Sequence, residues 1–166
     1  MTAARLHSIV YQPRDSNVRT ARPQASRFDR LAVERVLLRE GHGIEGDRKA
    51  GRSRKRHVNL LLLEWLMERE REGYRIDAGA FGEQLVIAGL GILPLDVGTR
   101  MRIGATATLE LTMPRTGCER LQAAQQRDDP LLLGHIGHLA KVTVTGVIAV
   151  GDPVLVERPP GTGRIR

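Results

Sequence analysis

The stretch Thr106-Ala107-Thr108-Leu109-Glu110-Leu111-Thr112-Met113 alternates apolar and polar side chains without a break. Successive side chains of a β-strand point to opposite faces, so this period of two gives one apolar face and one face of threonines and Glu110. The stretch therefore predicts a half-buried antiparallel strand. A proline cannot donate a hydrogen bond to a neighbouring strand, so we expect the strand to end at Pro114.

Most of the remaining chain also has the composition of short strands. Apolar and β-branched residues dominate positions 6–11, 31–38, 58–63 and 139–150. Helical spacing of leucines through residues 64–72, ended by Gly73, predicts one helix, and a further turn or two is expected at 119–126. Residues 15–30 are polar and arginine-rich, which favours a loop. Many short strands joined by glycine-rich turns are typical of a sandwich or a barrel, so we expect a mostly β fold with few short helices.

Two segments resemble each other at a distance of 53 residues. Residues 97–103 and 150–156 each place a glycine turn before a strand-like run. We therefore predict a turn that leads into a strand at both places. Pro153 implies that the last strand lies at a sheet edge or begins there.

The composition indicates one compact domain. The chain has 166 residues, of which 41% are hydrophobic and 27% charged, and a chain of this size can bury a sizeable core. We expect a single domain over residues 1–158 and a flexible tail at 159–166. No apolar run approaches the roughly 20 residues that cross a bilayer, and no signal peptide is evident, so we expect a soluble, cytoplasmic protein. A single cysteine excludes an intramolecular disulfide and an all-thiolate zinc site.

The positive charge is concentrated in the first part of the chain. Residues 1–60 carry a net charge of +8, whereas residues 61–166 carry −1. Six of the nine residues at positions 48–56 are Lys or Arg, which favours anion binding or, alternatively, a solvated loop. Nucleic acid is disfavoured as the partner because no aromatic residue lies between Phe28 and Trp65 to stack on bases. A small phosphorylated ligand fits at least as well.

Cys118 is the candidate reactive residue. It follows the Pro114 turn, and Arg115 and Arg120 flank it. Nearby cations and a following helix start would favour the thiolate, which is both a nucleophile and a soft metal ligand. Gly117 is expected to leave room for a ligand beside the sulfur. An inert cysteine is the alternative interpretation, and the flanking arginines count against it.

Other polar residues have weaker signals. Glycines at 41, 43 and 46 predict a bend with positive φ or a close backbone approach. His135 and His138 are three residues apart, but no Asp, Glu or Cys accompanies them at metal-ligand spacing, so we do not assign a metal there. Glu83 can act as a general acid or base, or can hold a loop by accepting backbone hydrogen bonds, and we leave it out of the catalytic set.

Four segments in order resemble the MOSC family, which occurs as the C-terminal domain of molybdenum-cofactor sulfurases and as small free-standing bacterial proteins. They are Gly-Ile-Glu-Gly-Asp-Arg at 43–48, Gly-Ala-Phe-Gly-Glu-Gln-Leu at 79–85, Pro-Arg-Thr-Gly-Cys at 114–118 and Gly-Val-Ile-Ala-Val-Gly-Asp at 146–152. With the segment Arg-His-Val-Asn-Leu-Leu at 56–61, the resemblance spans about residues 31–156. Lys49 and Gly117 depart from the family pattern, which often has histidine and proline there.

The resemblance implies a mostly β, barrel-like domain that binds the molybdenum cofactor (molybdopterin). It also implies a cysteine that meets sulfur or molybdenum, and Cys118 fills this role, as the catalytic residue and, in cofactor binding, as the thiolate ligand of molybdenum. The residues expected to hold the cofactor are Arg48, Lys49, Arg56, His57, Asn59 and Arg115.

Two mechanisms are consistent with this resemblance. In the first, the bound cofactor reduces a small N-hydroxylated substrate with electrons from an electron-transfer protein. In the second, Cys118 carries sulfur as a persulfide, taken from a separate cysteine desulfurase, and pyridoxal phosphate takes part only through that partner. The charge of the first 60 residues favours cofactor binding. A basic nucleic-acid-binding module, in which Cys118 is incidental, is the alternative from another class.

Overall fold

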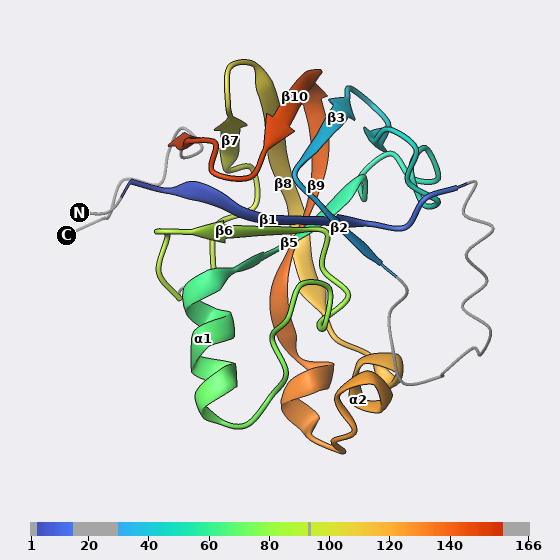
Figure 1. Cartoon of the computed structure of the whole chain (residues 1–166), viewed down its shortest axis with the longest axis vertical. Coiled ribbons are helices and arrows are strands. Elements are labelled where there is room, and N and C mark those ends of the chain that lie inside the picture. The colour runs from blue at the N-terminus through green and yellow to red at the C-terminus, as the bar shows by residue number, and fades with distance from the viewer. Residues whose placement is uncertain (1–2, 15–29, 93, 158–166) are drawn as a thin grey trace.

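The computed structural model describes residues 3–14, 30–92 and 94–157, and these form a mostly β structure. Eight strands form one sheet, in the order β11-β7-β8-β9-β5-β6-β1-β2, and three form a second sheet, in the order β10-β3-β4. Both α-helices lie on one side of the larger sheet, and β3 and β10 lie on the opposite side (Figure 1). The expectation of a mostly β fold with few short helices is confirmed.

The strands are β1 (Arg5–Tyr11), β2 (Leu31–Val33), β3 (Arg35–Arg39), β4 (Gly43–Ile44), β5 (Val58–Leu62), β6 (Leu85–Ala88), β7 (Arg100–Ile103), β8 (Ala107–Thr116), β9 (His135–Val144), β10 (Gly146–Ala149) and β11 (Val154–Glu157). The helices are α1 (Leu63–Arg71), α2 (Glu119–Gln125) and the short 3-10 helix η1 (Pro130–Leu133).

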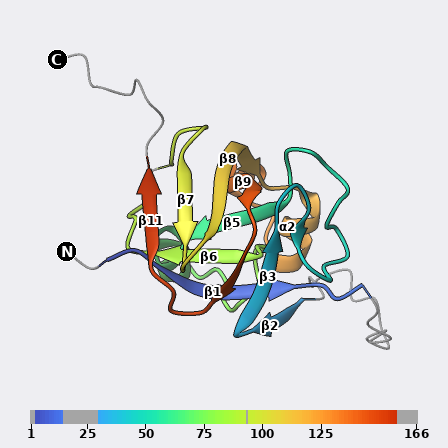
Figure 2. The same cartoon turned by 90° about the horizontal axis from the view of Figure 1, so that it is seen from above.

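The larger sheet curls without closing into a continuous barrel. Seen from above, β7, β8 and β11 run across the direction of β1, β5 and β6 (Figure 2). The N-terminal end of β1 meets the start of β11 at an isolated bridge between Arg5 and Pro153 and through a few neighbouring backbone hydrogen bonds, such as that from the Val154 N–H to the Ala4 carbonyl oxygen at 2.9 Å. Within the described residues, no further strand pairs with the outer side of β11 or of β2.

The continuous apolar run at 58–63 is explained by its central position. β5 pairs in parallel with β6 on one side and antiparallel with β9 on the other. All four residues of β6 are buried, as are four of the five in β5. Parallel neighbours need a crossover, and α1 provides it between these two strands. The two strands are covered on both faces, which is why they show no polar alternation.

The alternating stretch forms β8, as predicted, but the strand is longer than expected. Ala107, Leu109 and Leu111 are buried on one face. The strand continues through Pro114 to Thr116, so the prediction that it ends at the proline is wrong. The proline is tolerated because β7 pairs only with residues 107–110 of β8, which leaves one side of the strand open at position 114. Near this end of the strand, the register of β8 with β9 shifts between Leu111 and Met113 and again between Arg115 and Thr116.

The two similar segments turn out to be paired strands. β7 and β11 lie antiparallel, with Ile103 opposite Val154. β11 ends the strand order of its sheet, as Pro153 implied. The expected strand over residues 31–38 is instead two strands, and β2 and β3 belong to different sheets.

The helix predictions are confirmed to within a residue or two. α1 ends at Arg71, and Gly73 follows with a φ of +90°. α2 covers Glu119–Gln125. Within the described part of the chain, no helix is long and apolar enough to span a membrane. The expected loop at 15–30 lies outside the described residues except for Arg30, as does the expected tail at 159–166.

Candidate functional site

Cys118 is exposed at the start of α2, immediately after β8. Its carbonyl oxygen accepts the first hydrogen bonds of the helix, from the backbone N–H groups of Leu121 at 2.8 Å and Gln122 at 3.2 Å. The residue itself is extended, with a φ of −158°. The thiol is therefore held at the surface by a helix start rather than packed in the core.

Gly117 does not leave room for a ligand, which corrects the expectation from the sequence. A Cβ at this position would lie 1.6 Å from the carbonyl oxygen of Leu132. The Gly117 N–H also donates to the carbonyl oxygen of Gly134, at 3.0 Å. A glycine is needed here because the end of η1 crosses directly over the turn, and this crossing fixes the position of Cys118.

Arg115 lies beside Cys118, and a hydrogen bond to the loop that contains Phe81 holds its guanidinium group. Its Nη2 donates to the carbonyl oxygen of Phe81 at 2.5 Å. Burial lowers the pKa of Arg115 to about 10, against the opposing influence of the carboxylate of Glu83 and of Cys118. Its Nη1 is buried and makes no hydrogen bond within the described residues. A buried guanidinium N–H without an acceptor is costly, and an anionic ligand would remove that cost.

Glu83 holds the loop to which Arg115 is anchored. This carboxylate is 1% exposed and accepts hydrogen bonds from the backbone N–H groups of Gly79, at 2.6 Å, and Phe81, at 3.0 Å. Burial raises its pKa, although these hydrogen bonds and the nearby Arg115 lower it. The loop-holding interpretation of Glu83 is therefore the one that the geometry supports.

Four cations gather around this loop and Cys118. Burial lowers the pKa of Lys49, and the neighbouring Arg30, Arg120 and Arg115 lower it further. The pKa of Arg30 is also lowered, first by burial, and Arg120 contributes to that shift. Arg30 lies against Gly79. A Cβ placed at this glycine would be 3.5 Å from the Cβ of Arg30. We call Arg30, Lys49, Arg115 and Arg120 the cation cluster.

Asp47 and Gln84 support the cluster from within the fold. Asp47 is 1% exposed, and its carboxylate accepts hydrogen bonds from the backbone of Gln12 and Lys49 and from Nε2 of Gln84. The amide oxygen of Gln84 in turn accepts from the backbone N–H of Asn59 at 3.0 Å. Asn59 Oδ1 accepts from the Gln84 N–H at 3.1 Å. Asn59 is thus a partner of Gln84. It is linked to Lys49 only indirectly, through the hydrogen bonds of Gln84 and Asp47.

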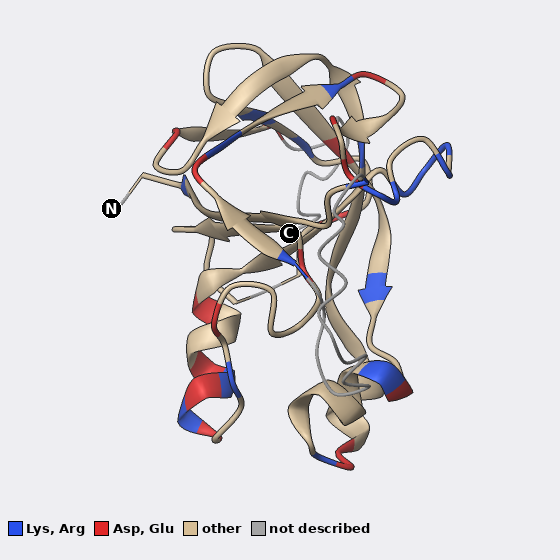
Figure 3. Cartoon of the chain, turned by 45° about the vertical axis from the view of Figure 1, so that its right-hand side comes forward, with Lys and Arg blue, Asp and Glu red and all other residues tan. Residues whose placement is uncertain are grey.

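The basic segment at 48–56 exposes all six of its cations, Lys49 included. It forms the projecting loop with the densest blue colour in Figure 3. Its backbone has a defined shape, because Ser53 Oγ accepts from the N–H groups of Lys55 and Arg56, and Thr112 donates to the Lys55 carbonyl oxygen. Arg48 and Arg56 are exposed, and among the described residues no hydrogen bond or ion pair links their side chains to the cluster.

His57 is buried away from the cluster. It is 5% exposed, and its Nδ1 accepts a hydrogen bond from the backbone N–H of Val142 at 2.9 Å. Burial lowers its pKa. Because Nδ1 must carry a lone pair to accept this bond, the ring contributes to the attachment of β5 to β9 as a neutral imidazole.

The structure therefore brings together three of the seven residues selected from the sequence, namely Lys49, Arg115 and Cys118. Arg30 was missed because it ends an arginine-rich stretch without periodicity, and no sequence signal distinguished it from its neighbours. Arg120 was noticed only as a flanking residue. The bend at positions 41, 43 and 46 is confirmed, with φ values of +67°, +123° and +82°, and it leads the chain to Asp47 and Lys49.

Comparisons with known proteins agree with this architecture. The sequence model of the MOSC domain matches residues 56–155. No curated protein matches the chain significantly by sequence.

Solved structures share the fold. YiiM from Geobacillus stearothermophilus superposes with a TM-score of 0.68 and 24% identity, over 95% of this chain and 77% of that one. The YuaD protein from Bacillus subtilis gives 0.72 and 19%, over 95% and 97% of the two chains. YiiM from Escherichia coli gives 0.62 and 23%, over 93% and 70%. The family match covers more than half of the sequence, and the chain belongs to the MOSC domain family.

Proposed function

We propose that this protein binds the molybdenum cofactor, with the cation cluster holding the phosphate of molybdopterin and the Cys118 thiolate bound to molybdenum. The observation that carries the proposal is the buried Nη1 of Arg115, which has no acceptor within the described residues and lies beside an exposed thiol. A guanidinium in this state favours a bound anion, and phosphate oxygens accept strongly from arginine.

The donor set fits a group that combines a phosphate with a soft metal. These cations lie close to one another: besides burial, Arg30 lowers the pKa of Arg115, and Arg30, Arg120 and Arg115 lower the pKa of Lys49. Such mutual repulsion is relieved when a multiply charged anion binds among them. Thiolate sulfur is a soft ligand suited to molybdenum.

Each supporting residue has a definable task in this proposal. The carbonyl oxygen of Phe81 holds the guanidinium group of Arg115, and the Glu83 carboxylate holds the backbone N–H of Phe81. Asp47 fixes the backbone of Lys49. The close crossing at Gly117 keeps Cys118 at the surface, open to a ligand. The cofactor, when bound, would supply a two-electron redox centre, and we propose small N-hydroxylated compounds as the substrates and a separate protein as the electron donor.

The proposed role of the cation cluster in holding the phosphate is tested by comparing alanine variants of two arginines. The wild type, Arg115→Ala and the control Arg52→Ala would be expressed in a host that makes the cofactor, purified without oxygen, and assayed for molybdenum and for released pterin. Arg52 belongs to the exposed basic loop and not to the cluster. We expect the control to retain wild-type content and Arg115→Ala to lose at least tenfold. Equal content in the two variants would contradict the proposal.

A persulfide carrier is the second candidate, and the exposure of Cys118 favours it. In this reaction the Cys118 thiolate attacks the outer sulfur of a desulfurase persulfide. A new sulfur–sulfur bond forms on Cys118, the bond in the desulfurase breaks, and the desulfurase cysteine leaves as a thiolate. The pyridoxal phosphate belongs to that partner. A lone exposed thiol suits a reducing compartment such as the cytoplasm.

The carrier is tested by intact mass after incubation with a cysteine desulfurase and cysteine. A gain of about 32 Da, one sulfur atom, that is removed by reductant and absent in Cys118→Ala would support the carrier. A mass that stays unchanged under these conditions would contradict it.

A further inference from the structure

The net charge of this protein is concentrated in one loop. Residues 48–56, the basic loop, contain six Lys or Arg and no Asp or Glu, and they therefore account for +6 of the total net charge of +7. The rest of the chain is close to neutral. The basic loop projects from the fold (Figure 3). A charge placed in this way directs an electric field outward from one side of the molecule and attracts an acidic partner to that side.

Most cations of the basic loop are exposed and have no acidic partner. Among the described residues, no salt bridge includes any of the five exposed cations other than Lys49, namely Arg48, Arg52, Arg54, Lys55 and Arg56. Glu45, the nearest exposed acid in the sequence, pairs instead with Arg39 at 3.0 Å. These five charges are therefore available to the carboxylates of another molecule.

The backbone of the basic loop is held in a defined shape. The Gly51 N–H donates to the carbonyl oxygen of His42 at 2.9 Å. Ala50 is 2% exposed, and its carbonyl oxygen accepts from Nη2 of Arg14 at 2.9 Å. Because the loop is already ordered, less conformational entropy is lost when a partner binds to it.

Both ends of the basic loop are attached beside the Cys118 site. At one end, Lys49 belongs both to the loop and to the cation cluster. At the other end, Thr112 of β8 donates to the carbonyl oxygen of Lys55 at 2.6 Å, and β8 leads directly to Cys118. In Figures 1 and 2 the loop lies on the same side of the molecule as α2, which begins after Cys118. A protein bound to the loop would therefore cover the side on which the thiol is exposed.

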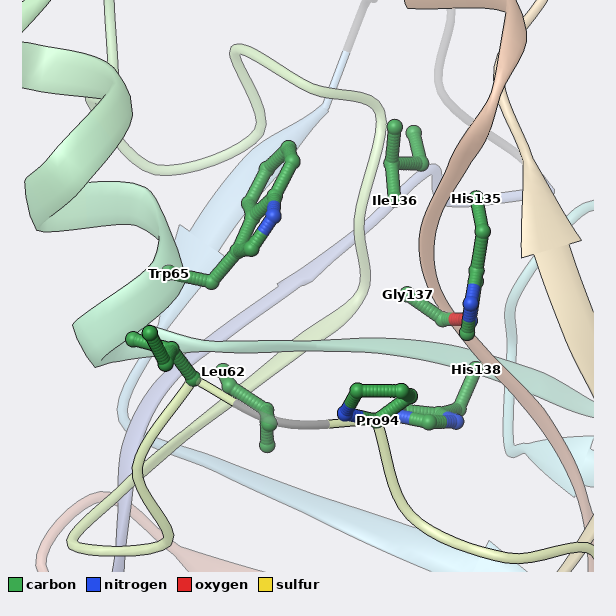
Figure 4. Close-up of a pocket in the computed structure, with 8 residues that line it drawn as sticks. Leu62, Trp65, Pro94, His135, Ile136, Gly137 and His138 are labelled. Carbon is green, nitrogen blue, oxygen red and sulfur yellow. The ribbon is translucent and has the colours of Figure 1, made fainter. Parts of the chain in front are cut away.

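The hollow between α1 and β9 offers no comparable surface (Figure 4). Leu62, Trp65, Ile92, Pro94 and residues 135–138 line it. The described lining contains no Lys or Arg, so an acidic partner would lose hydration there without gaining an ion pair. The basic loop is therefore the better docking surface for such a partner.

We propose that the basic loop docks the acidic face of a small electron-carrier protein, which serves the neighbouring Cys118 site. This proposal rests on the proposed function, because reduction at a bound molybdenum cofactor requires a protein that delivers electrons. Nucleic acid fits the loop less well. The loop has no aromatic side chain to stack on bases, and residues 48–56 form no helix or strand that could enter a groove. Complementary charge gives fast association and salt-sensitive complexes, as suits a transient electron donor.

The test measures, by isothermal titration calorimetry, the binding of a plant-type ferredoxin, which is a small acidic electron carrier. The loop variant replaces three exposed cations of the basic loop by glutamine: Arg52→Gln, Arg54→Gln and Lys55→Gln. The matched control loses the same charge from the start of β1, the end of α1 and β7, which lie away from the loop in Figure 1: Arg5→Gln, Arg71→Gln and Arg102→Gln. A DNA duplex of about 20 base pairs is the competing probe.

We expect the wild type to bind ferredoxin with a Kd of about 100 µM or tighter at about 50 mM NaCl, and at least tenfold more weakly at about 300 mM NaCl. The loop variant should raise the Kd at least tenfold and the control less than twofold. Amide chemical shifts of residues 51–56 should move on binding. No saturable binding of ferredoxin, equal Kd changes in the two variants, or tighter binding of the duplex than of ferredoxin at the same salt concentration would overturn the proposal.

Molybdenum content, measured on the same three proteins, separates this proposal from the proposed function. The loop variant should retain wild-type molybdenum, because none of its three replaced residues belongs to the cation cluster. Loss of molybdenum from the loop variant alone would make the loop part of the cofactor site and overturn its assignment as a docking surface. Wild-type protein without molybdenum would contradict cofactor binding, whereas the ferredoxin Kd values would still decide whether the loop docks an acidic protein.

Discussion

Replacing Gly117 by alanine tests whether the crossing of two chain segments places Cys118. The new Cβ would lie 1.6 Å from the carbonyl oxygen of Leu132, and atoms of this kind rarely approach within about 3.0 Å. The two segments must then separate by more than an ångström. Leu132 is fully buried, and the Gly117 N–H is bonded to Gly134, so neither segment can move without cost.

The expected loss of stability follows from these contacts. Overpacking in a well-filled interior costs about 1–3 kcal/mol. Weakening the backbone hydrogen bond between Gly117 and Gly134 adds about 1 kcal/mol. The reduced freedom of the unfolded chain returns about 0.4–1 kcal/mol. We therefore expect Gly117→Ala to lower the free energy of unfolding by about 2–3 kcal/mol, which for a chain of this size lowers the Tm by about 5–10 °C.

Urea unfolding followed by circular dichroism measures this loss, and Gly134→Ala is the matched control. Gly134 is the other partner of the same hydrogen bond, but a Cβ there meets its nearest atom, the Leu131 carbonyl oxygen, at an ordinary 3.5 Å. The control should lie within about 0.5 kcal/mol of the wild type. If both variants unfold at the wild-type urea concentration, the crossing does not constrain the turn and the reasoning is refuted.

Three further predictions concern buried polar groups. Burial lowers the pKa of His138 to about 4, so the neutral imidazole contributes stability above the ordinary histidine pKa, and this contribution is lost as pH falls toward 4. In urea unfolding, the free energy of unfolding should fall by about 3 kcal/mol over this range, and His138→Gln should not show this loss. Burial raises the pKa of Glu83, so the contribution of this side chain to the free energy of unfolding is greatest below the ordinary glutamate pKa and declines as pH rises through the raised value. Glu83→Gln should remove this decline with pH, and a variant with the wild-type pH profile of stability would contradict the prediction. Gln84→Ala leaves Asp47 and Asn59 without a shared partner and should cost about 2–3 kcal/mol, whereas exposed Gln126→Ala should cost under 1 kcal/mol.

Local patterns predicted the strands and helices well where one face is buried. The alternation before Met113 gave β8, and the leucine spacing before Gly73 gave α1. The end of β8 was misjudged because Pro114 lies where the strand has only one neighbour, and pairing of this kind is set by the tertiary fold. The partition of residues 31–38 between two sheets has the same origin.

Only part of the candidate site could be predicted from the sequence, because its residues come from distant parts of the chain. Cys118 and Arg115 lie three positions apart in sequence, so local composition was enough to find them. Arg30 reaches the cluster from a distant part of the chain, and its position against Gly79 is visible only in three dimensions. His57 and Asn59 carry polar side chains in a segment that matches the family, but their hydrogen bonds to Val142 and Gln84 bind strands together.

The most direct test of cofactor binding is molybdenum content measured together with intact mass, on wild type and Cys118→Ala purified without oxygen from a host that makes the cofactor. The account predicts close to one molybdenum per chain in the wild type and a loss of at least tenfold in Cys118→Ala. Full molybdenum content in Cys118→Ala, or wild-type protein that contains a reducible extra sulfur on Cys118 but no molybdenum, would contradict it.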